Sequence, residues 1–305
     1  MILLTGATGF LGSHILAILL AQNYKVAITV RESSDLFRIK ELLAHTSLEI
    51  VLLQGENLRR LFEKNKISSV IHTATNYGRD NIDFEHVIAA NLTLPLELLE
   101  LAITNDVQMF INTDSYFNKF GMSYQTLPAY SLTKKNLKLW LLHYSQKIKV
   151  INMQIEHLYG VNDSRSKFTE NIIRAVAINN VAQYPLTTGD QIRDFVFVTD
   201  AASAYLTVLE KTEAISARFI NYEVGSGRGT SVREFAKKVK NLSLSDTELQ
   251  FGRLQNRPDE IQSSVAANLD LIQLGWETKV GLEQGISYII DIYRNSSYHF
   301  DHGAQ

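Results

Sequence analysis

The stretch TGATGFLGS at residues 5–13 constrains the fold of this chain more than any other feature. It follows the apolar run MILL and opens a segment with helical periodicity, and it carries Gly6, Gly9 and Gly12 at equal spacing. Glycines so placed permit a tight turn and close backbone approach, so a pyrophosphate can bind the amides at the helix N-terminus. The stretch therefore predicts a strand–turn–helix unit that binds a dinucleotide, with an ordinary turn of this kind as the alternative.

Short apolar runs alternate with helix-period segments through the first half of the chain. The runs are KVAITV, LEIVLL, SSVIHTA, QMFINT and KVINMQI, and the helices are expected near 34–44, 58–64, 84–104 and 130–147. Buried strands joined by helices form parallel sheets that are covered on both faces. Residues 1–160 are therefore predicted to form a Rossmann-type, doubly wound α/β domain.

The alternation loosens after Gly160. Helices are expected near 168–178 and 200–211 and from Ser231 onward, with apolar runs RDFVFV and RFINYEVGS between them. Residues 161–305 are therefore predicted to form mainly a smaller α/β substrate-binding domain. It is expected to be partly interleaved with the first domain, to which some of its strands and helices return.

Composition narrows the classes of partner and site. The net charge of -2 shows no basic excess, so neither a nucleic acid nor an anionic membrane is predicted as a partner. The N-terminal segment lacks the basic region of a signal peptide and is interrupted by glycines, so a cytoplasmic location is expected. There are no cysteines, and His299 and His302 lie in a polar tail interpreted as frayed, without companion ligands, so no metal site is predicted.

The end of the second apolar run, AITVRESSDLFR, carries the signal for the type of dinucleotide. NAD sites place an acidic residue there for the ribose hydroxyls, and NADP sites favour arginine for the 2′-phosphate. Val30 occupies the acidic position, and the polar side chains that follow it favour NADPH: Arg31, Ser33, Ser34 and Arg38. NADH remains the alternative, because Glu32 lies among these residues and solvated charges at a strand end would look the same.

The motif YSLTK supplies an acid/base pair. Tyr130 and Lys134 are four residues apart, so on a helix both project from one face. A lysine cation beside a phenol is expected to lower the phenol pKa and make it a usable proton donor or acceptor. The pair is common by chance, so its value lies in its combination with the glycine stretch.

In these motifs the chain resembles the extended short-chain dehydrogenase/reductase family, which includes NAD-dependent sugar-nucleotide epimerases, dehydratases and reductases. The segments TGATGFLGS, IHTATNYG, AANLTLP, FINTDSYF, YSLTK, IEHLYG, IRDFVFVTD and LGWETKV occur in the family's order. The resemblance implies that Tyr130 is the acid/base, that Lys134 binds the nicotinamide ribose, and that the Thr113 hydroxyl contacts the reacting sugar oxygen. It also implies a homodimer.

The resemblance extends to further site residues. The cofactor contacts that it implies, besides those above, are Thr8, Phe10, Leu11, Thr73, Ala74, Thr75, Asn91, His157 and Leu158, with Glu56 and Asn57 as departures from the family's aspartate. The implied substrate contacts are Asn76, Asp114, Ser115, His157, Arg193, Arg257 and Glu260. Arg193 and Arg257 would hold a diphosphate, whereas Asp114 and Ser115 have helix or turn capping as an equal alternative.

The reaction type depends on two positions. Dehydratases of the family carry glutamate where this chain has Ser115, so dehydration is disfavoured, and the Arg31 region favours exchangeable NADPH and hence a reductase. Within the family the chain is similar to the CDP-abequose and CDP-paratose synthase group of O-antigen deoxysugar biosynthesis, which reduces CDP-4-keto-3,6-dideoxyglucose. Three alternatives stay open: a reductase of dTDP- or GDP-linked 4-keto-6-deoxysugars, an epimerase with tightly bound NAD, and a non-catalytic dinucleotide sensor.

Overall fold

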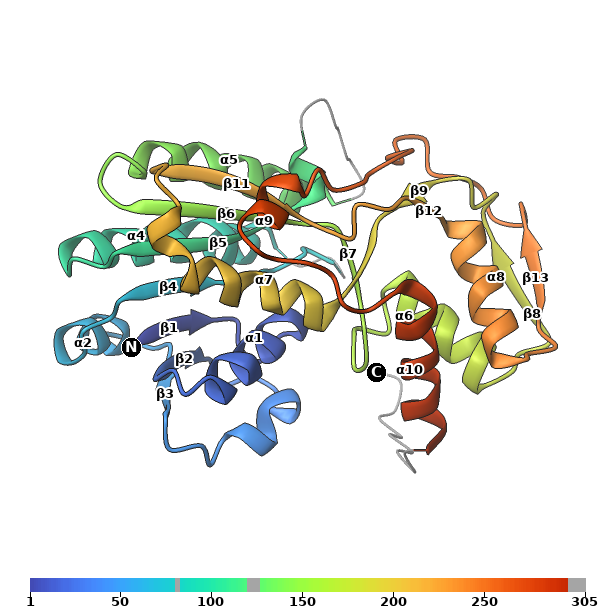
Figure 1. Cartoon of the computed structure of the whole chain (residues 1–305), viewed down its shortest axis with the longest axis horizontal. Helices are drawn as coiled ribbons and strands as arrows, with labels where there is room; N and C mark the ends of the chain where they lie inside the picture. The colour runs from blue at the N-terminus through green and yellow to red at the C-terminus, as the bar shows by residue number, and fades with distance from the viewer. Residues whose placement is uncertain (80–82, 120–126, 296–305) are drawn as a thin grey trace.

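The computed structural model describes residues 1–79, 83–119 and 127–295, so the tail with His299 and His302 lies outside the described residues. Its largest element is a seven-stranded sheet (Figure 1). Every neighbouring pair in this sheet is parallel. From edge to edge the strands are β11 (Phe219–Val224), β6 (Lys149–Ile155), β5 (Met109–Ser115), β4 (Ser69–His72), β1 (Ile2–Thr5), β2 (Val26–Val30) and β3 (Leu48–Leu52). This order confirms the predicted Rossmann-type fold.

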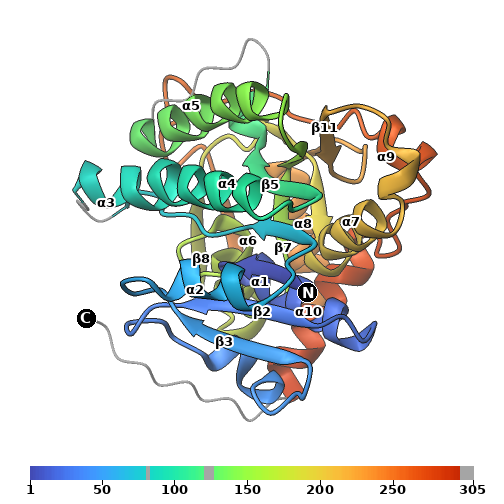
Figure 2. The same ribbon diagram turned by 90° about the vertical axis from the view of Figure 1, so that its left-hand side faces the viewer.

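Helices cover both faces of the sheet (Figures 1 and 2). The strands carry apolar side chains on each face, and both sets need to be buried. On one face, Leu4 and Ile71 pack with α1 (Phe10–Ala21) and α7 (Val198–Glu210). On the other, Leu3 and Val70 pack with α2 (Asn57–Lys64), α4 (Leu94–Thr104) and α5 (Pro128–Tyr144). Since α7 and β11 come from the C-terminal half of the chain, that half completes the first sheet and its cover.

The rest of the C-terminal half has a core of its own, which includes Tyr159, Phe195 and Phe235. Ser231 begins α8 as predicted, because its hydroxyl accepts from the Glu234 amide at 3.0 Å in an N-terminal cap. The elements of this part are α6 (Phe168–Ile172), the π-helical η4 (Ile173–Ile178), β8 (Gln183–Leu186), α8 (Val232–Ser243), β13 (Glu248–Phe251), α9 (Leu269–Gln273) and α10 (Leu282–Asn295). Four short strands form two separate two-stranded sheets: β7 (His157–Tyr159) pairs with β10 (Phe195–Phe197), and β9 (Ile192–Arg193) pairs with β12 (Thr230–Ser231).

Two expected helices differ from the prediction. The segment expected near 34–44 is the six-residue 3-10 helix η1 (Phe37–Leu42), in which Ile39 is the buried residue, so little apolar surface supports a longer helix. The segment near 84–104 is helical throughout but contains a π-helical turn, and its parts are α3 (Phe84–Ile88), η2 (Ala89–Thr93) and α4. The turn directs the buried Asn91 toward the loop after β4.

The same segment, Phe84–Thr104, is long and apolar enough to cross a membrane by length and composition alone. In this fold its Leu98, Leu99 and Ala102 are completely buried against the sheet and neighbouring helices. Those three residues belong to the core, whereas Phe84 and Ile88 in the first turns of the segment are exposed.

Candidate active site

A cavity of about 1510 Å³ runs from the glycine stretch to the C-terminal part of the molecule. Its walls are formed by the loops that follow the carboxyl ends of the parallel strands, where open α/β sheets bind ligands. The predicted residues that line it are Gly6, Thr8, Gly9, Phe10, Leu11, Gly12, Arg31, Ser34, Arg38, Thr73, Ala74, Thr75, Asn76, Thr113, Asp114, Ser115, Tyr130, Lys134, His157, Leu158, Arg193, Arg257 and Glu260. The fold therefore brings most of the predicted cofactor and substrate residues to one cavity.

Backbone geometry explains the glycines. Gly6 has a positive φ of 74°, and a Cβ there would lie 2.5 Å from the Ala74 amide nitrogen. A Cβ on Gly12 would lie 2.1 Å from the Gly6 carbonyl oxygen. Gly9, which has no side chain, occupies the N-cap of α1, so no capping group competes with an anion for the first helical amides. These residues fit the pyrophosphate of a dinucleotide.

The end of β2 presents Arg31 at the surface, and the Arg31 amide donates to Ser34 Oγ at 2.9 Å. Arg38 is differently placed. Its guanidinium donates to the Asn162 carbonyl at 2.9 and 3.1 Å and to the Thr8 carbonyl at 3.4 Å. Arg38 thus connects the glycine stretch to the turn after β7, at the edge of the cavity.

Four of the predicted cofactor residues are not among those that line the cavity: Ser33, Glu56, Asn57 and Asn91. Glu56 forms an exposed ion pair with Arg59, and Asn57 donates to the Leu52 carbonyl. Asn91 accepts from the Asn76 amide and donates to the Asn76 carbonyl, both at 2.8 Å. Asn91 therefore shapes the loop after β4, whose Asn76 does line the cavity.

Tyr130 and Lys134 lie on α5 and are both buried. Burial lowers the pKa of Lys134 to about 8, and its ammonium donates to the Thr113 carbonyl at 2.7 Å. Burial also raises the pKa of Tyr130 well above its ordinary value, the stacked Tyr77 adds to the rise, and a hydrogen bond from Ser115 opposes it. The prediction that the pKa of Tyr130 is lowered is therefore wrong for the protein alone, because burial is the largest influence on this phenol and disfavours its charged form. Tyr130 is held as a neutral phenol.

The carboxyl end of β5 places three polar side chains differently. Thr113 Oγ1 lies 2.7 Å from the Tyr205 hydroxyl of α7. Asp114 is buried and accepts from Asn152 at 2.9 Å and Asn118 at 2.7 Å, and burial raises its pKa. Ser115 caps the short 3-10 helix η3 (Tyr116–Asn118) by accepting from the Phe117 amide at 3.4 Å. The capping alternative thus has direct support for Ser115, while all three residues also line the cavity.

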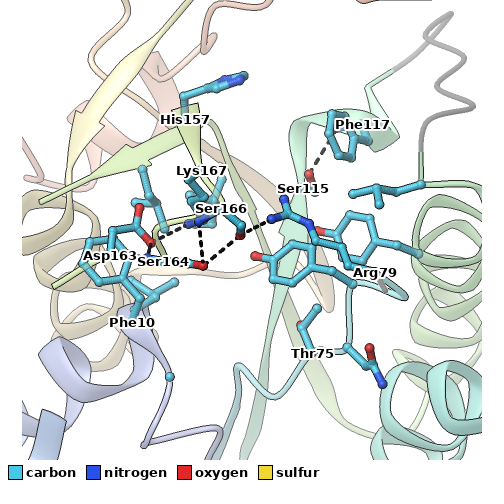
Figure 3. A pocket seen from close by; sticks show the side chains of 18 of the residues that line it. Phe10, Thr75, Arg79, Ser115, Phe117, His157, Asp163, Ser164, Ser166 and Lys167 are labelled. Atoms are coloured by element: carbon cyan, nitrogen blue, oxygen red, sulfur yellow. Dashed lines mark hydrogen bonds and ion pairs between the residues drawn. The ribbon is translucent and has the colours of Figure 1, made fainter. Parts of the chain in front are cut away.

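His157 of β7 is one of the residues that line the cavity (Figure 3). Its Nε2 is 3.1 Å from the Tyr116 hydroxyl. Burial lowers its pKa well below the ordinary value, and Arg193 and Lys167 lower it further, so the imidazole is neutral. Among the residues that the structure describes, no group of three His, Asp or Glu side chains could hold a metal ion.

The far end of the cavity contains paired charges. The buried Arg193 guanidinium lies 3.2 Å from Glu260 Oε1, and Gln191 Nε2 donates to Glu260 Oε2 at 2.7 Å. Arg257 lines the same end and is exposed. Glu260 therefore fixes the position of Arg193, the residue predicted to hold a diphosphate.

Some residues of the site were not identified from the sequence. The Tyr77 ring stacks on Tyr130 with centroids 5.0 Å apart, and Arg79 lies over Tyr77. Arg79 also donates to Ser166, so the loop after β4 reaches the loop after β7 (Figure 3). Tyr77 and Arg79 follow the predicted Asn76 in the segment NYGR, and this proximity is the only sequence signal that could have indicated them. No local pattern marks Ser166.

Comparisons with known proteins identify the family of the chain. The model of the NAD dependent epimerase/dehydratase family matches residues 2–225. A CDP-abequose synthase of Salmonella typhimurium is 32% identical over 297 residues, which cover 95% of this chain and 97% of that protein. A CDP-abequose synthase of Salmonella muenchen is 29% identical over 295 residues, with coverage of 95% and 97%. The solved UDP-glucose 4-epimerase of Thermotoga maritima superposes with a TM-score of 0.82 over 96% of this chain and 98% of its own, at 21% identity. The predicted resemblance is confirmed, and this chain is an enzyme that belongs to the NAD dependent epimerase/dehydratase family.

Proposed function

We propose that this enzyme uses NADPH to reduce the 4-keto group of a nucleotide-linked deoxysugar, with CDP-4-keto-3,6-dideoxyglucose as the favoured substrate. The observation that carries the proposal is the neutral, buried Tyr130 beside Lys134, between the glycine stretch and the Arg193–Glu260 pair. Similarity to the CDP-abequose synthases favours a CDP-linked sugar over the dTDP- and GDP-linked alternatives.

The residues have separate tasks in the reduction. When bound, the dinucleotide supplies the hydride to carbon 4. Tyr130 gives its phenolic proton to the keto oxygen, which completes the secondary alcohol, and the phenol then regains a proton from solvent. The Thr113 hydroxyl donates a hydrogen bond to the same oxygen, and the Lys134 ammonium favours loss of the Tyr130 proton as charge develops. A raised Tyr130 pKa suits this direction, because the residue starts as a donor.

The substrate end is assigned by charge. The chain has a net charge of -2, so a diphosphate needs local cations, and Arg193 and Arg257 provide them in the cavity wall. Glu260 holds Arg193 and has oxygen atoms that can also accept from ribose hydroxyls. Ser115 occupies the position where dehydratases carry glutamate, which argues against elimination.

The cofactor assignment rests on Arg31. Val30 provides no carboxylate for the ribose hydroxyls, and the Arg31 side chain is exposed beside the cavity at the end of β2. A 2′-phosphate can accept from its guanidinium in a charge-assisted pair.

The function is tested by mixing the protein with NADPH or NADH and CDP-, dTDP- and GDP-linked 4-keto sugars. We expect NADPH absorbance to fall fastest with the CDP-linked sugar, and NMR of the product gives the configuration at carbon 4. Tyr130→Phe should lower turnover by roughly 100-fold or more while cofactor affinity stays near wild type. Absence of NADPH oxidation with every sugar would refute the reductase assignment.

Two rivals predict different results in the same preparation. An NAD-recycling epimerase would be purified with tightly bound NAD and would act without added cofactor. A non-catalytic sensor would bind NADPH but oxidise none of it. Nucleotide released by heat denaturation and identified by chromatography separates the epimerase from the reductase, and the absorbance assay separates the sensor from the reductase.

We also propose a homodimer. On α5, Leu132 and Leu139 are 62% and 66% exposed, two turns apart on one face, with Trp140 beside them at 45%. On α3, Phe84 is 63% exposed. A second copy of the chain would cover these apolar side chains. Sedimentation equilibrium should give twice the chain mass for the wild type, and Leu139→Lys should shift the protein toward monomer.

A further inference from the structure

Helices α5 and α7 lie on opposite faces of the sheet (Figure 1), and a residue from each contacts Thr113. From α5, Lys134 Nζ donates to its carbonyl oxygen at 2.7 Å. From α7, the Tyr205 hydroxyl lies 2.7 Å from Oγ1 of its side chain. Residue 205 is 92 positions away in the sequence, and Tyr205 is not among the residues that line the cavity. Thr113 does line it, so a buried phenol reaches the cavity only through the Thr113 hydroxyl.

The direction of the Tyr205–Thr113 hydrogen bond follows from satisfaction of polar groups. Tyr205 is 0% exposed and is packed in the apolar core between α1, α7 and the sheet. In the part of the chain that the structure describes, Thr113 Oγ1 is the hydrogen-bond partner of the Tyr205 hydroxyl. If Thr113 donated, the phenolic hydrogen would be buried without an acceptor, which costs roughly 1–3 kcal/mol. If Tyr205 donates, both groups are satisfied and the Thr113 hydrogen is left for the cavity.

Tyr205 also remains a donor at every working pH. Burial raises its pKa well above the ordinary value, and the nearby Asp114 carboxylate raises it further, while the contact with Thr113 opposes this. The phenol therefore keeps its hydrogen where an exposed tyrosine would begin to lose it.

We propose that Tyr205 is a positioning residue: it donates to Thr113 Oγ1 and so directs the Thr113 hydroxyl hydrogen at the sugar oxygen that is reduced. This inference rests on the proposed function, in which Thr113 contacts that oxygen. Because Tyr205 donates to Thr113 before substrate binds, the Thr113 hydroxyl hydrogen already points into the cavity and need not reorient during the reaction.

The test compares Tyr205→Phe with the wild type. The substitution keeps the ring and removes one hydroxyl, and Tyr222→Phe is the control, since Tyr222 is 4% exposed in the same core cluster and does not line the cavity. We expect Tyr205→Phe to lower kcat by roughly 3- to 10-fold, the value of one hydrogen bond, with KM for NADPH unchanged. Tyr222→Phe should leave kcat near wild type.

A second background separates positioning from packing. In Thr113→Val, which has no hydroxyl to orient, adding Tyr205→Phe should lower kcat no further. Equal losses in the two backgrounds, or wild-type kcat in Tyr205→Phe, would overturn the inference. If the wild type reduces no 4-keto sugar, the proposed function fails but the inference is still decided. Binding of CDP-, UDP- and dTDP-glucose, measured by calorimetry, should then weaken about 3-fold in Tyr205→Phe for each sugar nucleotide that binds, and unchanged or undetectable binding of all three would refute it.

Discussion

The two ends of the cavity differ in the groups that form them: backbone atoms at one end and side chains at the other. At the cofactor end, Gly6 and Gly12 leave space for one backbone to approach another, and an added Cβ would lie within 2.5 Å of backbone atoms. At the substrate end, polar and charged side chains position one another: Glu260 pairs with Arg193, and Gln191 donates to Glu260. Backbone geometry cannot change without moving the fold, whereas side-chain pairs can be exchanged. The family's shared dinucleotide and its varied sugars fit this division.

The largest effect is expected at the cofactor end, from Gly12→Ala. Its Cβ would lie 2.1 Å from the Gly6 carbonyl oxygen, so the turn must move. We expect loss of about 2–3 kcal/mol in the free energy of unfolding and loss of measurable NADPH binding. Gly281→Ala is the matched control, because a Cβ there meets nothing within 4 Å, and its stability should stay within about 1 kcal/mol of wild type. Full cofactor affinity in Gly12→Ala would contradict the contrast between the two ends.

Sequence patterns predicted the parts of this site that depend on local order. The glycine turn, the alternation of strands and helices and the helix that opens near Ser231 are encoded within a few residues, and the structure confirms them. The Arg38–Asn162 and Thr113–Tyr205 contacts join residues 124 and 92 positions apart, so no local pattern could reveal them. The Tyr130 pKa was mispredicted for the same reason, since burial is a property of the assembled fold.

The next effect is expected where the two ends meet, from Lys134→Met. Removing the ammonium should lower kcat by roughly 100-fold, because Tyr130 loses the cation that favours release of its proton. The melting temperature of Lys134→Met should equal or exceed that of the wild type. Burial lowers the Lys134 pKa to about 8, which means that a charged ammonium at this position destabilises the folded protein. Exposed Lys135→Met is the control and should keep wild-type turnover.

The pH dependence of the wild type follows from the same lysine. Turnover should fall as pH rises through about 8, when Lys134 loses its proton in the folded state. Stability should move the opposite way. Between about 8 and the ordinary value of 10.5 the unfolded chain binds this proton and the folded chain does not, so wild-type stability rises with pH relative to Lys134→Met. Parallel pH profiles of stability for the two proteins would contradict this assignment.

A smaller effect is expected at the substrate end, from Glu260→Gln. The change keeps the side-chain shape but removes the charge that holds Arg193 at 3.2 Å. We expect KM for the sugar nucleotide to rise roughly 20-fold with kcat within about 2-fold, because binding is affected and the acid/base residues are not. Glu248→Gln is a matched control, since Glu248 also accepts from a glutamine, Gln183, but away from the cavity. A fall in kcat with constant KM would place Glu260 in the chemistry instead.

The smallest effect is expected from Arg31→Ala, which tests whether a side chain at the cofactor end selects NADPH over NADH. Arg31 is exposed, so solvent screens its charge, and we expect the KM for NADPH to rise only about 5-fold. The KM for NADH should stay constant, because NADH has no 2′-phosphate to accept from the guanidinium. Arg60→Ala, an exposed arginine outside the cavity lining, controls for net charge. If the KM values for NADPH and NADH change equally, Arg31 does not bind the 2′-phosphate, and the backbone alone determines cofactor binding at this end.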